Sequence, residues 1–316
     1  MGFFLVRFNI QEVNFLIFYK LGINVTRVLL FFIFGNKSTL VLLLVHHRTP
    51  LNKSIMNIRV IQWNISFKCK VDKIAKFLKD HIYQSTIIHL QEVSSQQHDK
   101  LIKFLKPDDC AFSLNIRPKG IFEGKNRALG VATFIFNGRI ESSHLLDRSV
   151  FPERTLLVNS ILGTKQVKTL NFHSLTGVDY KKAKSSNFAS IADFLHQEKD
   201  NIDFFCCDAN EPKIDSLHEP DLEFWDNKDK GKNAELLFGQ NKVHGLVDSF
   251  RTHLINNGIT NTSNPLAISH KTGPNGRRYD FIYNSKKWNI TSVEYLYQDS
   301  IKATSDHSIV IGNYKY

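Results

Sequence analysis

Six short polar motifs stand at the ends of apolar runs that are typical of buried strands. In chain order they are Gln62-Trp63-Asn64, Gln91-Glu92, Asn171-Phe172-His173, Asp208-Ala209-Asn210, Arg278-Tyr279-Asp280 and Ser305-Asp306-His307. Carboxylate and amide oxygens are the ligands that hard divalent cations prefer, and histidines transfer protons or stabilise anions. Six such motifs in one chain therefore predict a centre that uses a divalent metal to act on a phosphate ester.

Segments that alternate between strand and helix patterns from Met56 onward must position these motifs. Apolar, β-branched runs predict strands at Ile58–Trp63, Thr86–Leu90, Leu129–Phe136, Thr155–Leu162, Val167–Phe172, Ile202–Cys207, Tyr279–Asn284 and His307–Gly312. Apolar residues at helical spacing predict helices at Val71–His81, Gln97–Leu105 and Ser186–His196. Strands and helices mixed over this length predict an α/β (α+β) sandwich, with two sheets flanked by helices.

The composition is that of a folded protein with a basic surface. The chain has 316 residues, of which 42% are hydrophobic and 22% charged, which excludes disordered and collagen-like classes. The net charge of +11 suits a polyanionic partner, either nucleic acid or an anionic lipid surface, but a solvated basic surface explains it equally well. The four cysteines lack paired C-x-x-C spacing, which disfavours structural zinc and a disulfide framework and favours a cytoplasmic protein.

Residues 1–55 differ from the rest of the chain in being rich in apolar runs. The stretch Val28–Val45 is nearly long enough to span a bilayer, but Lys37 would lie in the middle of it. Three interpretations are open: a membrane anchor or hairpin, a packed extension, or an upstream segment outside the functional protein. We favour the third, in which translation begins at Met56 and residues 56–316 form the functional domain. A membrane-anchored protein is the alternative.

The polar, charge-rich stretch Pro212–Gly245 interrupts the alternation of strands and helices. It follows directly after Asp208 and Asn210, and a loop of this length in a compact domain is usually functional or disordered. We interpret it as a substrate-facing insertion. A surface loop that is held in place by its aromatic residues is a near-equal alternative.

With these motifs in place, the chain from Met56 to Tyr316 resembles the endonuclease/exonuclease/phosphatase superfamily, which has the DNase I-like fold. The resemblance is carried by the six motifs above, with Gln91-Glu92 extended to Val93 and Asp280 extended to Phe281-Ile282. It implies a four-layer sandwich, in which two mixed sheets pack face to face with helices outside. It also implies a hydrolase of phosphoric esters that depends on Mg²⁺ or Mn²⁺.

The resemblance assigns a role to each candidate residue. Glu92, Asn64 and Asp306 are the expected metal ligands. The expected catalytic residues are His307, with Asp306 holding its imidazole, together with Asp208, Asn210, His173 and Asp280. Either His307 or Asp208 could be the general base. Arg154 and Arg278 are expected to bind substrate, with a surface salt bridge as an equal alternative for Arg154. The adjacent cations Arg277 and Arg278 are expected to keep Asp280 ionised.

Within the superfamily, we favour the interpretation that the protein is a nuclease acting on DNA or RNA. The basic segments Arg117-Pro118-Lys119, Lys181–Lys184 and Lys271–Arg278 suit contacts with phosphates. In having a histidine at position 173, the chain resembles the DNase I, deadenylase and phospholipid-phosphatase branches rather than the abasic-site endonucleases. The alternative is a phosphatase or phospholipase C-like hydrolase of a phosphoinositide or sphingomyelin headgroup. A catalytically dead binding module is disfavoured because all six motifs are intact, and we expect a monomer.

Overall fold

A computed structural model describes residues 3–10, 13–22, 25–34, 43–47 and 56–316, the last range with gaps at 122, 199–200 and 226–232. For the first four ranges and for residues 125–126 it describes the backbone only. The chain divides into two compact units, Met1–Ile55 and Met56–Tyr316. Each unit is described by itself.

The first unit contains a four-stranded antiparallel sheet in which neighbours in sequence pair with one another. Its strands are β1 (Phe3–Ile10), β2 (Val13–Gly22), β3 (Val25–Phe34) and β4 (Leu43–His47). The stretch Val28–Val45 therefore contains parts of two strands, and residues 35–42 between them lie outside the described residues. In the part of the chain that the structure describes, no helix combines the length and the apolar character needed to cross a bilayer.

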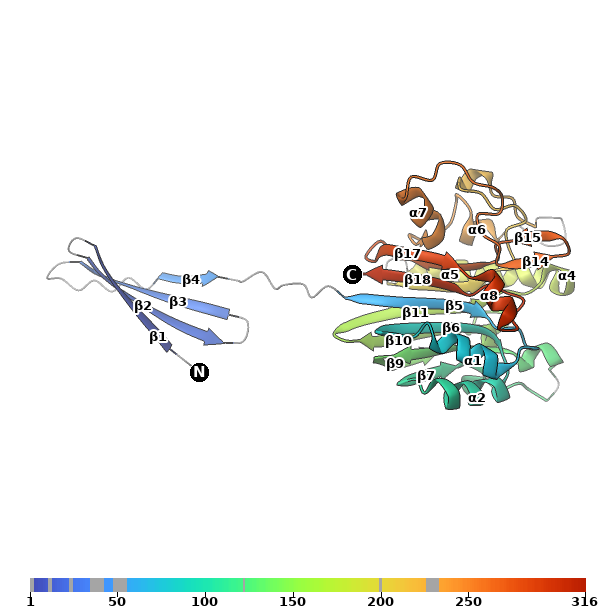
Figure 1. Cartoon of the computed structure of the whole chain (residues 1–316), viewed down its shortest axis with the longest axis horizontal. Helices are drawn as coiled ribbons and strands as arrows, with labels where there is room; N and C mark the ends of the chain where they lie inside the picture. Colours follow the sequence, from blue (N-terminus) through green and yellow to red (C-terminus); the bar gives the residue numbers. More distant parts are fainter. Residues whose placement is uncertain are drawn as a thin grey trace. The chain divides into compact units, whose positions relative to one another are not determined.

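Two six-stranded mixed sheets form the centre of the second unit (Figure 1). In spatial order the first sheet consists of β17 (Asn289–Tyr295), β18 (Val310–Lys315), β5 (Asn57–Asn64), β6 (Ser85–Val93), β8 (Gly130–Phe136) and β7 (Asp109–Phe112). The second consists of β13 (Val247–Asp248), β16 (Asp280–Asn284), β12 (Phe204–Asp208), β11 (Lys165–His173), β10 (Thr155–Leu162) and β9 (Gly138–His144). Each sheet has one parallel pair, β5 with β6 and β11 with β12, among antiparallel neighbours.

Helices and short hairpins complete the unit. The α-helices are α1 (Val71–Lys79), α2 (Ser95–Leu105), α3 (Ser113–Ile116), α4 (Gly177–Tyr180), α5 (Lys182–Glu198), α6 (Glu235–Phe238), α7 (Ser249–Asn256) and α8 (Tyr297–Lys302). The 3₁₀ turns are η1 (Lys125–Ala128), η2 (Pro152–Arg154) and η3 (Glu219–Asp221). Strands β14 (His270–Thr272) and β15 (Asn275–Arg277) form a separate hairpin.

The alternation of side chains along the central strands produces four layers. Val60 on β5 and Cys206 on β12 belong to the core between the sheets, whereas their neighbours Ile61 and Cys207 belong to the outer cores. Helices α1 and α2 cover the outer face of the first sheet, and α5 and α6 cover that of the second. The predicted four-layer α/β sandwich is therefore confirmed.

A network of buried amides joins the two sheets. Gln62 on β5 donates to Gln91 on β6 at 2.9 Å and to Asp280 on β16 at 3.0 Å. Gln91 in turn donates to Asn171 on β11 at 2.8 Å, and the Asn171 amide donates to two main-chain carbonyls of the first sheet, those of Leu90 and Ala132. All four side chains are fully buried, so each bond replaces hydration that was lost on folding. The network fixes the two sheets against each other at one end.

Replacing Gln91 by Leu tests the contribution of this network. The substitution leaves the Asn171 carbonyl and one donor of Gln62 without their partner, and each orphaned buried group costs about 1–3 kcal/mol. We expect a lower free energy of unfolding in urea denaturation. The matched control is Gln166→Leu on the exposed face of β11, which should change stability by less than about 0.5 kcal/mol. Equal stability of the two variants would contradict a structural role for the network.

Candidate active site

The predicted polar motifs meet at one end of the two sheets. Asn64 ends β5, His173 ends β11 and Asp208 ends β12. Asp208 lies opposite His173 in the parallel pair and opposite Asp280 in the antiparallel pair with β16. Because β16 starts where β12 ends, a carboxylate from each strand is placed at the same end of the second sheet.

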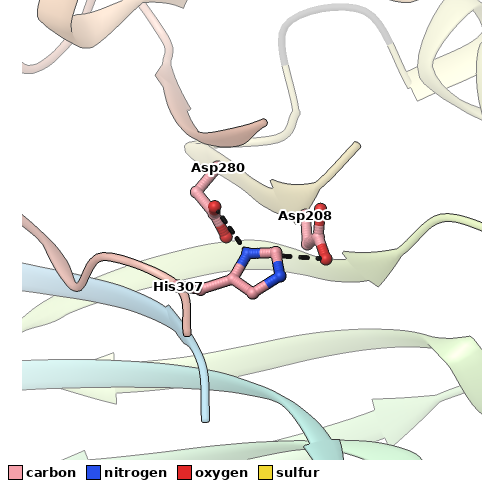
Figure 2. A group of neighbouring side chains, drawn as sticks. All are labelled: Asp208, Asp280 and His307. Atoms are coloured by element: carbon pink, nitrogen blue, oxygen red, sulfur yellow. Dashed lines mark hydrogen bonds and ion pairs between the residues drawn. The ribbon is translucent and has the colours of Figure 1, made fainter. Parts of the chain in front are cut away.

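Asp280 and His307 form the closest pair in this group. His307 Nδ1 lies 2.9 Å from Asp280 Oδ2 and 3.9 Å from Asp208 Oδ2, and all three side chains are buried (Figure 2). Burial alone would lower the pKa of His307, but the charges of Asp280 and Asp208 outweigh it and raise the pKa to about 10. His307 is therefore protonated at neutral pH, with Nδ1–H donating to Asp280 and Nε2–H left as a second donor.

Asp208 occupies a crowded and buried position beside this imidazolium. Asn64 Nδ2 donates to its Oδ2 at 2.9 Å, and the backbone N–H of Asn210 donates to its Oδ1 at 3.1 Å. Burial, reinforced by the charge of Asp280, raises the pKa of Asp208 to about 7, although His307 opposes the shift. A carboxylate poised near neutrality can accept a proton from water.

His173 and Arg154 lie on the other side of Asp208. His173 Nε2 is 3.6 Å from Asp208 Oδ2 and 3.8 Å from Glu92 Oε1, while Nδ1 is 3.2 Å from Arg154 Nη1. Burial and the charges of Arg154 and His307 hold the pKa of His173 well below its ordinary value, so the ring is neutral. Since the guanidinium can only donate, Nδ1 is the acceptor and Nε2–H faces the carboxylates.

Arg154 is a buried cation that pairs with none of the carboxylates the structure describes. Its side chain forms no salt bridge among the described residues of Met56–Tyr316, and its Nε has no hydrogen-bond partner there. Burial lowers its pKa, and the charges of Tyr180, Glu92, Glu153 and Asp208 oppose that effect. A guanidinium with a buried donor still available beside the site is suited to a phosphate oxygen.

Glu92 is the acid of the site that opens to solvent. A β-bulge between Leu90 and Val93 interrupts the pairing of β6 with β8, and Glu92 in this bulge has a φ of +57°. The bulge directs the Glu92 side chain away from the end of the sheet, and 22% of this side chain is exposed. Glu92 Oε2 accepts a hydrogen bond from the backbone N–H of Phe67 at 3.1 Å.

The donor set suits Mg²⁺ or Mn²⁺. Glu92 offers hard carboxylate oxygens, Asp306 is exposed in the turn before His307, and Asn64 directs Nδ2 to Asp208 while its Oδ1 accepts from the Ser66 backbone N–H. Asp208, Asp280 and His307 also place one ligand atom each within 4.8 Å of one another. In that second group, however, the protonated imidazole already supplies the positive charge between the carboxylates. We therefore keep Glu92, Asn64 and Asp306 as the expected ligands.

A small cavity adjoins the site on the side of Asn210. Asn210 is half-buried, has a φ of +51° and donates weakly to the Ser174 carbonyl at 3.5 Å. The cavity beside it measures about 240 Å³ and is walled by the rings of Trp225, Tyr279 and His270. Trp225 belongs to Pro212–Gly245, so part of that insertion does face the site, while Leu237 and Phe238 of the same stretch pack into the core.

Solved structures share this architecture. The human Nocturnin catalytic domain with bound sulfate anion aligns with a TM-score of 0.56 at 17% identity, over 82% of this chain and 96% of that chain. D. rerio TDP2 complexed with single strand DNA product aligns with a TM-score of 0.55 at 11% identity, over 82% and 98%. An endonuclease/exonuclease/phosphatase from Beutenbergia cavernae aligns with a TM-score of 0.57 at 15% identity, over 82% and 71%. No protein-family model and no curated protein matches the sequence.

The chain has the DNase I-like fold of the endonuclease/exonuclease/phosphatase superfamily. This confirms the fold that the resemblance of the six motifs implied. At these identities the alignments establish the fold of the chain, and the roles of its residues are argued below from the geometry of the site.

Two expectations for individual residues of this endonuclease/exonuclease/phosphatase fold need correction. Asp306 does not hold the His307 imidazole, because Asp280 occupies that position and Asp306 is exposed. Arg278 does not reach the substrate, because its side chain is fully buried and bonded to Asp215 and Asp248. Those two carboxylates, rather than Asp280, are its ionic partners.

Several residues that shape the site were not predicted to do so. Gln62, Gln91 and Asn171 belong to the recognised motifs, but they connect the sheets instead of facing the substrate. His270 stacks on His307 with ring centroids 4.3 Å apart and interacts with the Asp306 carbonyl through Nδ1 at 3.3 Å. Its only signal in the sequence is its residue type, because the β14–β15 hairpin that carries it has no apolar periodicity.

Replacing Asp280 by Asn tests the electrostatic coupling of the pair. The pKa of His307 should fall clearly below about 10, because Asp280 is the strongest influence raising it. The imidazole titration can be followed by NMR in metal-free protein. The matched control is Asp306→Asn, which should shift the pKa far less because that carboxylate is exposed and contributes least. A larger shift in the control would restore Asp306 as the partner.

Replacing Arg278 by Met tests the corrected role of that arginine. The substitution leaves Asp215 and Asp248 buried with Arg251 as their remaining ionic partner, and breaking a buried ion pair costs about 3–5 kcal/mol. We expect a correspondingly lower free energy of unfolding in urea. Arg277→Met, at the adjacent half-buried position, should cost less than about 1 kcal/mol. Unchanged stability combined with a raised KM would instead support substrate binding by Arg278.

Proposed function

We propose that the second unit is a divalent-metal-dependent phosphodiester hydrolase that acts on nucleic acid. The observation that carries the proposal is the buried Asp280–His307 pair, which lies within ion-pair distance of Asp208. The pair is at the end of the sheets where Glu92 is partly exposed to solvent. This arrangement combines a carboxylate poised near neutrality, a fixed imidazolium and a solvent-exposed oxygen donor. Together they can activate water, stabilise the charge of the phosphate and hold a cation, which suits phosphodiester hydrolysis.

The residues divide the chemistry among them. Asp208, whose pKa is raised to about 7, accepts the proton of the attacking water, and Asn64 holds this carboxylate in place. His307 donates from Nε2 to the phosphate, while Asp280 keeps the ring charged and oriented. A cation held by Glu92, Asn64 and Asp306 would supply further charge neutralisation when bound.

His173 and Arg154 complete the anion site. Neutral His173 presents Nε2–H towards the carboxylates, and Arg154 offers a donor that has no partner in the described residues. Both donors are buried, so they act in a low-dielectric environment and need no reorganisation as negative charge grows on phosphorus. Asn210, at the mouth of the 240 Å³ cavity, adds an amide that can orient a non-bridging oxygen.

Three observations support nucleic acid as the substrate. From Met56 onward the chain has 35 Lys and Arg residues against 29 Asp and Glu, and this net charge of +6 attracts a polyanion. The cavity beside Asn210 is walled by Trp225, Tyr279 and His270, and such rings can stack on a base attached to the cleaved phosphate. The TDP2 structure with single strand DNA product shows a protein of this fold with nucleic acid. A phosphoinositide or sphingomyelin headgroup is the competing substrate class.

The direct test is to assay the full chain, loaded with Mg²⁺ or Mn²⁺, against DNA, RNA, a phosphoinositide and sphingomyelin. We expect cleavage of nucleic acid that stops when the metal is chelated. His307→Ala should lower kcat by roughly 10²–10⁴-fold, the range for groups that handle protons in the transition state. Glu92→Gln should raise the metal concentration needed for half-maximal activity.

The matched control is His144→Ala, at an exposed position on edge strand β9, which should leave kcat unchanged. Circular dichroism should show that each variant is folded. Cleavage that survives chelation would remove the metal from the proposal, and turnover of only the lipid substrates would transfer the proposal to a lipid headgroup hydrolase.

A further inference from the structure

A second, larger groove is lined by Phe67, whose backbone N–H donates to Glu92. It has a volume of about 620 Å³ and runs between the loop that follows β5 and helix α2. The side chains that matter here are Phe67, Lys70, Lys100, Lys103 and Phe104. The roles proposed above leave this groove unassigned.

Two phenylalanines are exposed in this groove. Phe67 is 53% exposed and Phe104 is 43% exposed, and both line the same depression. Leaving part of a large apolar side chain in water forgoes the favourable free energy of burying it. Single exposed apolar residues are common, but a pair in one groove indicates a surface that binds a partner.

The charged residues of the groove point to an anionic partner. Lys70, Lys100 and Lys103 line it, against the single acid Asp72. None of the three lysines forms a salt bridge in the part of the chain that the structure describes, so their charge is available to a ligand. Lysines interleaved with exposed aromatic rings are typical of surfaces that follow a single nucleic-acid strand, with bases stacking on the rings and phosphates near the lysines.

The backbone of the groove is fixed on the side of the active site. The Phe67 N–H donates to Glu92 Oε2 at 3.1 Å, and the Phe67 carbonyl accepts from Gln97 Nε2 at 3.2 Å. Gln97 also closes the capping box of α2 with Ser94. The Phe67 ring is therefore presented by a chain segment that is tied both to the helix and to Glu92, so little order has to be gained on binding.

From these contacts we infer that the groove binds a single-stranded segment of the substrate beyond the phosphate that is cleaved. Bases would stack on Phe67 and Phe104, and backbone phosphates would lie near Lys70, Lys100 and Lys103. The inference rests on the proposed function in one respect, that the substrate is nucleic acid. It adds that the enzyme prefers single strands or frayed ends to intact duplex.

Binding of a labelled single-stranded oligonucleotide to the full chain, with chelator present to prevent cleavage, tests the lysines. The double variant Lys100→Glu/Lys103→Glu should bind more weakly, and the slope of log affinity against log salt should decrease by about 0.7 for each phosphate that the variant no longer neutralises. The control is Lys73→Glu/Lys76→Glu, which makes the same charge change on α1 at a different depression. The control should leave the salt slope unchanged.

The aromatic part of the proposal has its own pair of variants. Phe104→Ala should weaken binding of the oligonucleotide at least about fivefold, the lower end of the stacking contribution of one base. Ile301→Ala removes an apolar side chain of equal exposure, 43%, on α8 and should leave affinity unchanged. Duplex of the same sequence should bind more weakly than the single strand to the unaltered protein.

A small bis-aryl phosphodiester separates this inference from the proposed function, because it cannot extend into the groove. The groove variants should hydrolyse it at the unaltered rate. If the unaltered protein cleaves no phosphodiester, the proposed function fails. If cleavage is intact but the groove variants bind the oligonucleotide like their controls, the groove inference is overturned. It is equally overturned if they lose only binding to phosphatidylserine vesicles, which would assign the groove to a lipid surface.

Discussion

The buried contact between Gln62, Gln91, Asn171 and Asp280 is the constraint on which the rest of this molecule depends. It joins the two sheets through side-chain amides at the end where the reactive groups converge. It also places Asp280, because Gln62 donates to Oδ1 and so leaves Oδ2 for His307. Sheet packing and imidazole orientation are therefore set by the same hydrogen bonds, and a change in one alters the other.

Charge balance explains how so many ionisable groups can be buried together. The imidazolium of His307 lies between two carboxylates, and the guanidinium of Arg154 lies beyond the neutral ring of His173. The two cations flank Asp208 without neutralising it fully, so burial still raises its pKa to about 7. Arg278 and Arg251 compensate Asp215 and Asp248 in a separate buried cluster that stabilises the fold.

The sequence predicted the sandwich and most of the converging residues, because apolar strand runs ending in polar residues have a strong local signal. It did not predict which side chains would pair with one another. The resemblance implies that Asp306 orients His307, but β18 begins only at Val310 and the preceding turn directs the ring to Asp280 on the other sheet. Likewise, the buried state of Arg278 depends on Asp215, 63 residues away, and no local pattern encodes such a pairing.

Glu92 has a left-handed backbone conformation, which costs conformational free energy in a residue that carries a carboxylate of the site. A φ of +57° suits glycine or asparagine, and a longer L-residue adopts it only under constraint from its surroundings. Glycine and asparagine would relax the bulge and remove the carboxylate, whereas glutamate keeps the carboxylate in a strained backbone conformation. Glycine here would relieve the local strain but remove the carboxylate, so stability and the chemistry proposed for this site make opposite demands on residue 92.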